Sequence, residues 1–288
     1  MVKNVSVIGA GNMGQQIAMN AAITGFHVHV HDSNPEMLKK MQTFKTEYLA
    51  GRVQKGRLTR EQADAAAERL VIEADFEKAV SDADLVIEAV IELLEVKRDV
   101  FKKLDEVCPA HTILTTNSSY ICSSEIAGAT GRPDKVCNMH FFFPALVMKL
   151  VEIAKGPETS DETVAAVYEA SEKMAKVPIV LNREIPGFIV NRLTEMYTHE
   201  AYKLADMGIA SPEDIDKAAK YGLGYPKGPF ELADLTGIDL AYKIYCDRYS
   251  KSGDPADLPG VLLSRHYHAG EYGVKTGKGF YDYSGKDE

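Results

Sequence analysis

The stretch VSVIGAGNMG, residues 5–14, decides the fold of this chain. Its apolar first half predicts a short buried strand, and its glycines follow the spacing G-x-G-x-x-G. That spacing alone is a weak signal. Here a helix with apolar residues on one face, at positions 17–22, comes directly after it, and a second strand ends at Asp32. The pattern over residues 3–32 therefore predicts a βαβ unit.

Each part of the glycine-rich loop has a physical role. Gly9 allows a tight turn, Gly11 lets the backbone approach a pyrophosphate, and Gly14 lets helix and strand pack closely. The first turn of the helix, with Asn12 and Met13, offers unpaired N–H groups to phosphates. We therefore expect a dinucleotide site, and the alternative is a glycine turn in some other α/β protein.

An acid at the end of the second strand indicates which dinucleotide is bound. Asp32 lies 18 residues after Gly14, where a carboxylate accepts hydrogen bonds from the adenosine ribose hydroxyls. A 2′-phosphate would be repelled there, and Ser33 and Asn34 supply no arginine to offset the repulsion. The sequence thus predicts NAD rather than NADP, unless Asp32 is merely solvated.

Composition excludes several classes of protein. The chain has 288 residues, 45% hydrophobic and 26% charged, with a net charge of −9. We expect neither nucleic acid nor membrane as a partner, because the net charge repels both and no apolar run approaches the roughly 20 residues of a membrane span. The four cysteines show no metal-binding spacing. With a predicted strand starting at Lys3, we expect a cytoplasmic protein without leader, disulfide or metal site.

The rest of the chain divides into two patterns. Helices predicted at 35–56 and 59–69 form a helical hairpin, an unusual insertion in a dinucleotide fold. Further predicted strands are 71–72, 85–87, 112–116, 136–142, 148–154 and 178–181, with helices at 93–107 and 160–176. Helices alone are predicted afterwards, at 188–207, 213–221, 229–250 and 258–270. We expect a Rossmann-like doubly wound α/β domain at 1–184 with the hairpin inserted, and an all-α domain at 185–288.

A histidine and an acid are placed to form a catalytic pair. His140 ends a predicted strand, and Glu152 lies 12 residues later on the next one. A hairpin turning near Leu146 would set the two side chains opposite each other. A carboxylate beside an imidazole fixes its tautomer and stabilises the imidazolium, as a base needs when NAD oxidises an alcohol. The alternative for His140 is a packed core histidine.

Seven motifs give the chain a resemblance to a known family. They are residues 7–14, VIEAVIELLEVK (86–97), TNSSY (116–120), HFFFPALVMKLVE (140–152), PGFIVNR (186–192), GYPKGPFEL (224–232) and KTGKGFY (275–281). Over essentially its whole length the sequence resembles the short-chain 3-hydroxyacyl-CoA dehydrogenases, including bacterial 3-hydroxybutyryl-CoA dehydrogenases. The resemblance implies an NAD-binding first domain and a second domain that covers the substrate and forms a homodimer.

The resemblance also implies roles for single residues. His140 matches the general base and Glu152 its orienting partner. Ser119 and Asn191 match residues that bind the substrate and its reacting oxygen. Residues matching family positions near the cofactor are Ala89, Glu92, Lys97, Asn117 and Lys275. Alternatives are a helix N-cap for Ser119, a domain-junction hydrogen bond for Asn191, and a solvated helix start for Glu92 and Lys97.

The inserted hairpin corresponds to the family's CoA-contacting element. Its composition agrees, because residues 36–60 carry seven Lys or Arg residues against two Glu, a local excess of five positive charges. Such an excess on an acidic protein suits the phosphates of CoA. We expect Lys55 and Arg57 to contact them first, and the alternative is a solvated amphipathic hairpin.

The sequence departs from the family pattern within the motif that begins at His140. The family usually has asparagine where this chain has Phe143, and Val-Pro where it has Ala145 and Leu146. Phe143 removes a polar contact near the reacting carbon and adds bulk. This favours either a subfamily with a different acyl pocket or a paralogue with weak activity on ordinary substrates, and the intact catalytic residues favour an active enzyme.

These patterns predict an enzyme that oxidises an (S)-3-hydroxyacyl-CoA, such as 3-hydroxybutyryl-CoA, reversibly with NAD. One alternative is a dehydrogenase of a free hydroxy acid or sugar acid on the same fold. Another is an NAD-binding protein that has lost catalysis, against which the intact His140 and Glu152 argue.

Overall fold

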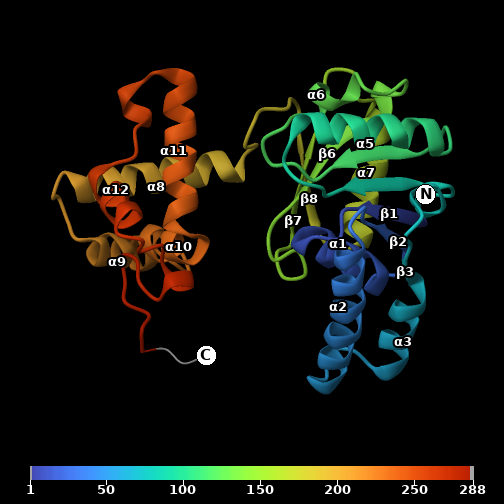
Figure 1. Cartoon of the computed structure of the whole chain (residues 1–288), viewed down its shortest axis with the longest axis horizontal. Helices are drawn as coiled ribbons and strands as arrows, with labels where there is room; N and C mark the ends of the chain where they lie inside the picture. The colour runs from blue at the N-terminus through green and yellow to red at the C-terminus, as the bar shows by residue number, and fades with distance from the viewer. Residues whose placement is uncertain (1, 286–288) are drawn as a thin grey trace. The chain divides into compact units, whose positions relative to one another are not determined.

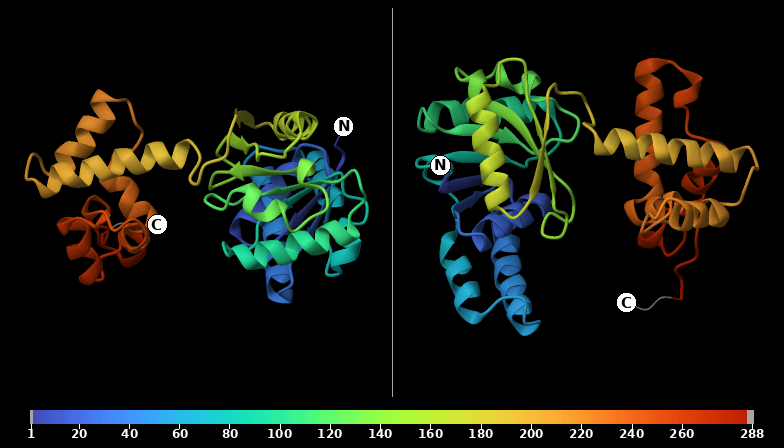
Figure 2. Two further views of the ribbon diagram at one scale, coloured as in Figure 1. Left: turned by 90° about the horizontal axis from the view of Figure 1, so that it is seen from above. Right: turned by 180° about the vertical axis from the view of Figure 1, so that it is seen from behind.

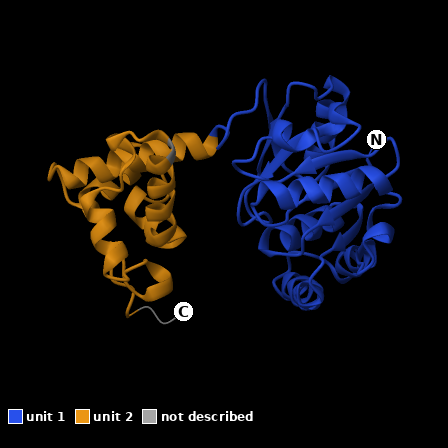
Figure 3. Cartoon of the chain, turned by 45° about the horizontal axis from the view of Figure 1, so that its top comes forward, with its two compact units in different colours: residues 1–189 blue, residues 190–288 orange. Residues whose placement is uncertain are grey.

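The computed structural model describes residues 2–285 and divides the chain into two compact units, Met1–Ile189 and Val190–Glu288 (Figure 3). The alternation of strands and helices in the sequence lies in the first unit, and the run of helices lies in the second. Each unit has its own buried apolar cluster. Each is described below by itself.

An eight-stranded sheet forms the centre of the first unit, in the order β3-β2-β1-β4-β5-β6-β7-β8 (Figure 1). The strands are β1 (Asn4–Ile8), β2 (His27–His31), β3 (Leu70–Ile72), β4 (Leu85–Glu88), β5 (Ile113–Thr116), β6 (Val136–Phe141), β7 (Leu150–Ala154) and β8 (Val177–Leu181). Neighbouring strands run parallel except β6 and β7, which are antiparallel. The strand order reverses beside β1, and sheets of this kind bind ligands at such a point, at the carboxyl ends of the strands.

Helices cover both faces of this sheet (Figure 2). They are α1 (Asn12–Ile23), α2 (Pro35–Gln54), α3 (Arg60–Arg69), α4 (Phe76–Val80), α5 (Leu94–Val107), α6 (Ser123–Ala127) and α7 (Asp161–Lys173). One apolar cluster joins α1, α2, α3 and α7 to the sheet, and a second joins α4, α5 and α6 to the other face. The predicted doubly wound α/β fold with its inserted hairpin, α2–α3, is confirmed.

The described residues of the second unit form helices joined by loops, as predicted, with two isolated β-bridges near residue 278. The α-helices are α8 (Val190–Asp206), α9 (Pro212–Gly222), α10 (Pro229–Thr236), α11 (Ile238–Ser252) and α12 (Val261–His268). The single helix predicted at 229–250 is wrong, because α10 and α11 are separated at Gly237, whose φ of 106° no right-handed helix contains. Phe230, Ile238 and Leu263 lie in the core of this unit.

The sequence does not predict the short helices α4 and α6. Each has five residues, which is less than two turns, so no apolar periodicity develops along it. Among the helices of the described residues, none is long and apolar enough to cross a membrane.

Candidate active site

The glycine-rich loop joins the carboxyl end of β1 to the start of α1, beside the point where the strand order reverses. A Cβ atom on Gly14 would lie 1.8 Å from the Gly9 carbonyl oxygen, and one on Gly9 would lie 2.5 Å from the carbonyl oxygen of Ala89. Both glycines are therefore required by close packing. Gly11 faces open space, and in the described part of the chain no side chain caps α1 at this position. The first turn of α1 thus presents backbone N–H groups to an anion, which fits the pyrophosphate of NAD.

Asp32 is held at the edge of this loop by two backbone groups. Its Oδ2 accepts a hydrogen bond from the Ala10 N–H at 2.8 Å, and its Oδ1 accepts one from the Asn34 N–H at 2.8 Å. The carboxylate is half-buried beside the loop that would hold the pyrophosphate. It therefore places a negative charge where an adenosine ribose would lie, and where a 2′-phosphate would be repelled.

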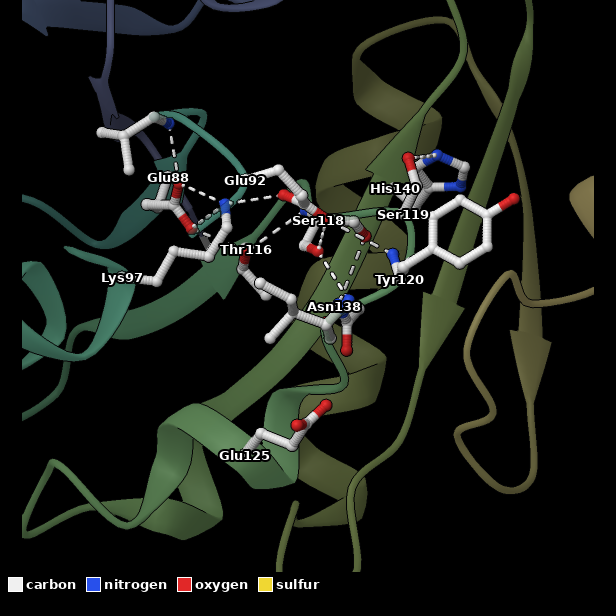
Figure 4. Close-up of polar contacts among 12 residues, drawn as sticks. Glu88, Glu92, Lys97, Thr116, Ser118, Ser119, Tyr120, Glu125, Asn138 and His140 are labelled. Atoms are coloured by element: carbon white, nitrogen blue, oxygen red, sulfur yellow. Dashed lines mark hydrogen bonds and ion pairs between the residues drawn. The ribbon is translucent and has the colours of Figure 1, made fainter. Parts of the chain in front are cut away.

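A buried lysine and two glutamates lie at the end of β4 and the start of α5 (Figure 4). The Lys97 ammonium is 2.9 Å from Glu88 Oε1 and 3.2 Å from Glu92 Oε2. Lys97 and Glu88 are 1% and 0% exposed, so the alternative of a solvated helix start is wrong for Lys97. Glu88 also accepts hydrogen bonds from the Val90 N–H at 2.7 Å and the Thr116 hydroxyl at 2.7 Å. The sequence analysis missed Glu88.

Glu92 is the member of this network that reaches solvent, with 45% of its side chain exposed. It accepts a hydrogen bond from the Ser118 hydroxyl. Burial raises its pKa, but the hydrogen bond from Ser118 and the charge on Lys97 outweigh burial and hold the pKa below its usual range. Glu92 is therefore an anion at neutral pH, fixed in place by Lys97, and we infer that Lys97 positions it.

His140 and Glu152 form the predicted pair. They are directly opposite in the antiparallel ladder of β6 and β7, and the distance from His140 Nδ1 to Glu152 Oε2 is 2.9 Å. Both side chains are buried. A carboxylate only accepts hydrogen bonds, so Nδ1 carries the hydrogen and the lone pair of the neutral ring lies on Nε2. The predicted juxtaposition of the two side chains is confirmed. His140 is buried, but it has a polar partner, unlike a histidine that only packs in the core.

Ser119 completes a chain of three hydrogen-bonded side chains. Its Oγ lies 3.0 Å from His140 Nε2, so the hydroxyl meets the nitrogen that carries the lone pair (Figure 4). The alternative of a helix N-cap is wrong, because Cys122 occupies that position before α6. Asn117 supports the same region, since its Oδ1 accepts a hydrogen bond from the Phe141 N–H at 2.9 Å.

Comparison with known proteins identifies the family. The model of the 3-hydroxyacyl-CoA dehydrogenase NAD binding domain matches residues 4–185, and that of the 3-hydroxyacyl-CoA dehydrogenase C-terminal domain matches residues 187–283. The chain belongs to the 3-hydroxyacyl-CoA dehydrogenase family.

Individual proteins that resemble the chain carry names that fit this family. A probable 3-hydroxybutyryl-CoA dehydrogenase of Bacillus subtilis is 41% identical over 99% of both chains. The crystal structure of the (S)-3-hydroxybutyryl-CoA dehydrogenase of Ralstonia eutropha superposes with a TM-score of 0.90 at 35% identity, covering 98% of this chain and 99% of that one. A 3-hydroxybutyryl-CoA dehydrogenase structure from Escherichia coli gives a TM-score of 0.92 at 39% identity, with all of this chain covering 61% of that longer chain.

Four further residues to which the resemblance assigns roles are not part of the Ser119–His140–Glu152 hydrogen-bond chain. Asn191 is in the first turn of α8, and Lys275 lies in the short 3-10 helix Val274–Thr276, where it forms an ion pair with Asp239; both residues belong to the second unit. Lys55 and Arg57 are exposed in the turn between α2 and α3. The roles of these four residues stay predictions. Among the described residues, no group of three His, Cys, Asp or Glu side chains is arranged to hold a metal.

Phe143, where the resemblance to the family leads us to expect asparagine, lies in the loop between β6 and β7 with 62% of its surface exposed. Lys176 anchors this loop. Its ammonium donates hydrogen bonds to the carbonyl oxygen of Ala145 and to that of Met148, the latter at 2.9 Å. The Leu146 N–H donates to Gln16 at 3.3 Å. Phe143 is thus an exposed aromatic side chain on an anchored loop, three residues from His140.

Proposed function

We propose that this chain catalyses the reversible NAD-dependent oxidation of an (S)-3-hydroxyacyl-CoA, with 3-hydroxybutyryl-CoA as a substrate. The observation that carries the proposal is the chain of hydrogen bonds Ser119–His140–Glu152, which lies beyond a glycine loop suited to NAD in a member of this family. The alternative of a free hydroxy acid or sugar acid is not favoured, since the relatives named above are CoA thioester dehydrogenases.

His140 is the general base of the proposed reaction. Glu152 keeps the hydrogen on Nδ1, so Nε2 is free to take the proton of the substrate's 3-hydroxyl group. NAD, when bound, supplies the acceptor for the hydride that leaves carbon 3. Glu152 is fully buried, and its charge stabilises the imidazolium that forms at His140. In the reverse direction the same imidazolium returns its proton to the keto oxygen.

Ser119 and Asn191 bind the reacting oxygen in this proposal. The Ser119 hydroxyl already meets Nε2 at 3.0 Å, so an oxygen that hydrogen-bonds both groups lies in line for proton transfer. Asn191 is carried over from the family motif PGFIVNR, with the amide available as a donor to the keto oxygen. Glu92, Lys97, Asn117, Ala89 and Lys275 serve the cofactor, and Lys55 and Arg57 the phosphates of CoA.

NADH-linked reduction of acetoacetyl-CoA tests the proposal. We expect turnover that follows acetoacetyl-CoA concentration and is far weaker with NADPH, because Asp32 repels a 2′-phosphate. His140→Ala should abolish this turnover while NADH binding, followed by fluorescence, persists. Absence of turnover by the unaltered protein at neutral pH would refute the proposal, and unchanged activity in His140→Ala would assign the chemistry elsewhere.

We also propose that the chain forms a homodimer in the cytoplasm. The second unit exposes several large apolar side chains, including those of Leu193, Met196, Leu223 and Leu240, and such surfaces are typical of subunit contacts. Sedimentation analysis tests the assembly. A mass of one chain, about 32 kDa, at micromolar concentration would contradict the dimer.

A further inference from the structure

The last three residues of the first unit contact all three members of the Ser119–His140–Glu152 chain. The Gly187 N–H donates to the carbonyl oxygen of Ser119 at 3.0 Å. The ring of Phe188 lies 5.4 Å, centroid to centroid, from the imidazole of His140. The Ile189 N–H donates to Glu152 Oε1 at 3.1 Å. Consecutive residues of one short segment, 187–189, thus contact three residues that are far apart in the sequence: the main chain of Ser119 and the side chains of His140 and Glu152.

The backbone of this segment takes a conformation that side chains rarely adopt. Gly187 has φ of 80° and Phe188 has φ of 48°, both in the left-handed region. Glycine adopts this conformation freely, but a bulky residue in it is strained. Such outliers persist only where the surroundings hold them, and they concentrate at functional sites. Phe188 is held by its burial at 1% exposure, in a cluster with Ala154 and Leu181.

The three contacts restrain different degrees of freedom. Ile189 occupies Glu152 Oε1, which leaves Oε2 as the oxygen that faces His140 Nδ1. The ring of Phe188 and that of Phe142, at 4.6 Å, limit rotation of the imidazole. Gly187 fixes the main chain at Ser119, from which the hydroxyl points to Nε2. Without these contacts, the hydrogen bonds of the chain alone would have to hold its geometry.

We propose that residues 187–189 form a positioning clamp, in which Phe188 acts on catalysis through His140 without touching the substrate. This inference rests on the proposed function, since it assigns Phe188 to the reaction of that same site. The competing interpretation is that Phe188 only fills the core beneath β7 and β8. The two interpretations differ in one respect: a clamp loses its value when the imidazole has already lost its orienting carboxylate, and a core side chain does not.

A double-mutant cycle between Phe188→Leu and Glu152→Gln separates them. We expect Phe188→Leu alone to lower kcat about tenfold or more, with KM for acetoacetyl-CoA little changed, because a small misplacement of a base is costly. In the Glu152→Gln background, the same substitution should lower kcat by less than about twofold, because residues that act as one unit are non-additive. Leu181→Val is the matched control, since it trims a side chain of the same cluster for which the described residues show no hydrogen bond or ring contact with Ser119, His140 or Glu152, and it should leave kcat unchanged.

If Phe188→Leu does not fold, Phe188→Met replaces it in the cycle. The ring tautomer of His140 gives a second, independent measurement. Nitrogen-15 NMR of the histidine rings should show His140 as one tautomer, protonated at Nδ1, in the unaltered protein, and a mixture of tautomers in the variant. Equal fold losses of kcat in both backgrounds, or an unchanged tautomer, would overturn the clamp. If the unaltered protein itself shows no turnover, the proposed function fails instead.

Discussion

Glu152→Gln tests the centre of the proposed mechanism, because glutamine has nearly the shape of glutamate but only one accepting oxygen. In the structure both carboxylate oxygens accept, Oε1 from the Ile189 N–H and Oε2 from His140 Nδ1. The amide oxygen can keep only one of these bonds, and its NH2 group must face the other partner. The backbone N–H cannot become an acceptor, so the NH2 group turns to the imidazole.

This exchange inverts the tautomer of His140. With a donor opposite it, Nδ1 must hold the lone pair and the hydrogen moves to Nε2, which then has no lone pair to take the substrate proton. The analogous change in a serine protease triad, a worked case for this reasoning, lowers kcat about 10⁴-fold. We expect a loss of about 10³- to 10⁴-fold here, equivalent to about 4–5.5 kcal/mol of activation free energy.

The assay is steady-state reduction of acetoacetyl-CoA by NADH, with circular dichroism and NADH binding as checks that the variant is folded. Glu158→Gln is the matched control, because Glu158 is an exposed acid a few residues further along the chain, and it should turn over normally. A kcat for Glu152→Gln within tenfold of the unaltered protein would refute the assignment of His140 as a base oriented by this carboxylate.

Three further predictions concern the rest of the first unit. Lys97→Met should lower the free energy of unfolding in urea by about 3–5 kcal/mol, since it leaves the fully buried Glu88 charge unpaired, and adding Glu88→Gln should recover part of the loss. Asp32→Asn should raise KM for NADH about tenfold and lower the ratio of kcat/KM for NADH to kcat/KM for NADPH. An unaltered ratio would contradict the role of the Asp32 carboxylate in selecting the cofactor. Lys55→Glu combined with Arg57→Glu should raise KM for acetoacetyl-CoA about tenfold and leave KM for NADH unchanged, whereas indifference of both constants would place CoA elsewhere.

Local patterns explain why much of the fold was predictable. The glycine loop lies within ten residues and is bounded by a strand and a helix, so each signal supports the next. The pair His140 and Glu152 was predictable because a hairpin of known length converts a separation of 12 residues into a cross-strand contact. Here spacing along the chain determines spacing in the structure.

Contacts between distant segments were not predictable in this way. The segment 187–189 meets Ser119, His140 and Glu152 across separations of 37 to 68 residues, and nothing in its composition indicates those partners. Glu88 ends a buried strand, where an acid suggests only a strand boundary; its partner Lys97 becomes evident only when α5 packs back on β4.

The reversed direction of β7 places the two side chains of the proposed proton transfer within the sheet and the loop around Phe143 outside it. The base and its acid are set by ladder pairing, and a slip of one residue would turn Glu152 to the opposite face of the sheet. The loop that joins the two strands lies outside the ladder. We therefore expect that its residues, among them Phe143, can be exchanged without moving Glu152 out of register with His140, so that a change in acyl selectivity need not alter the proposed proton transfer.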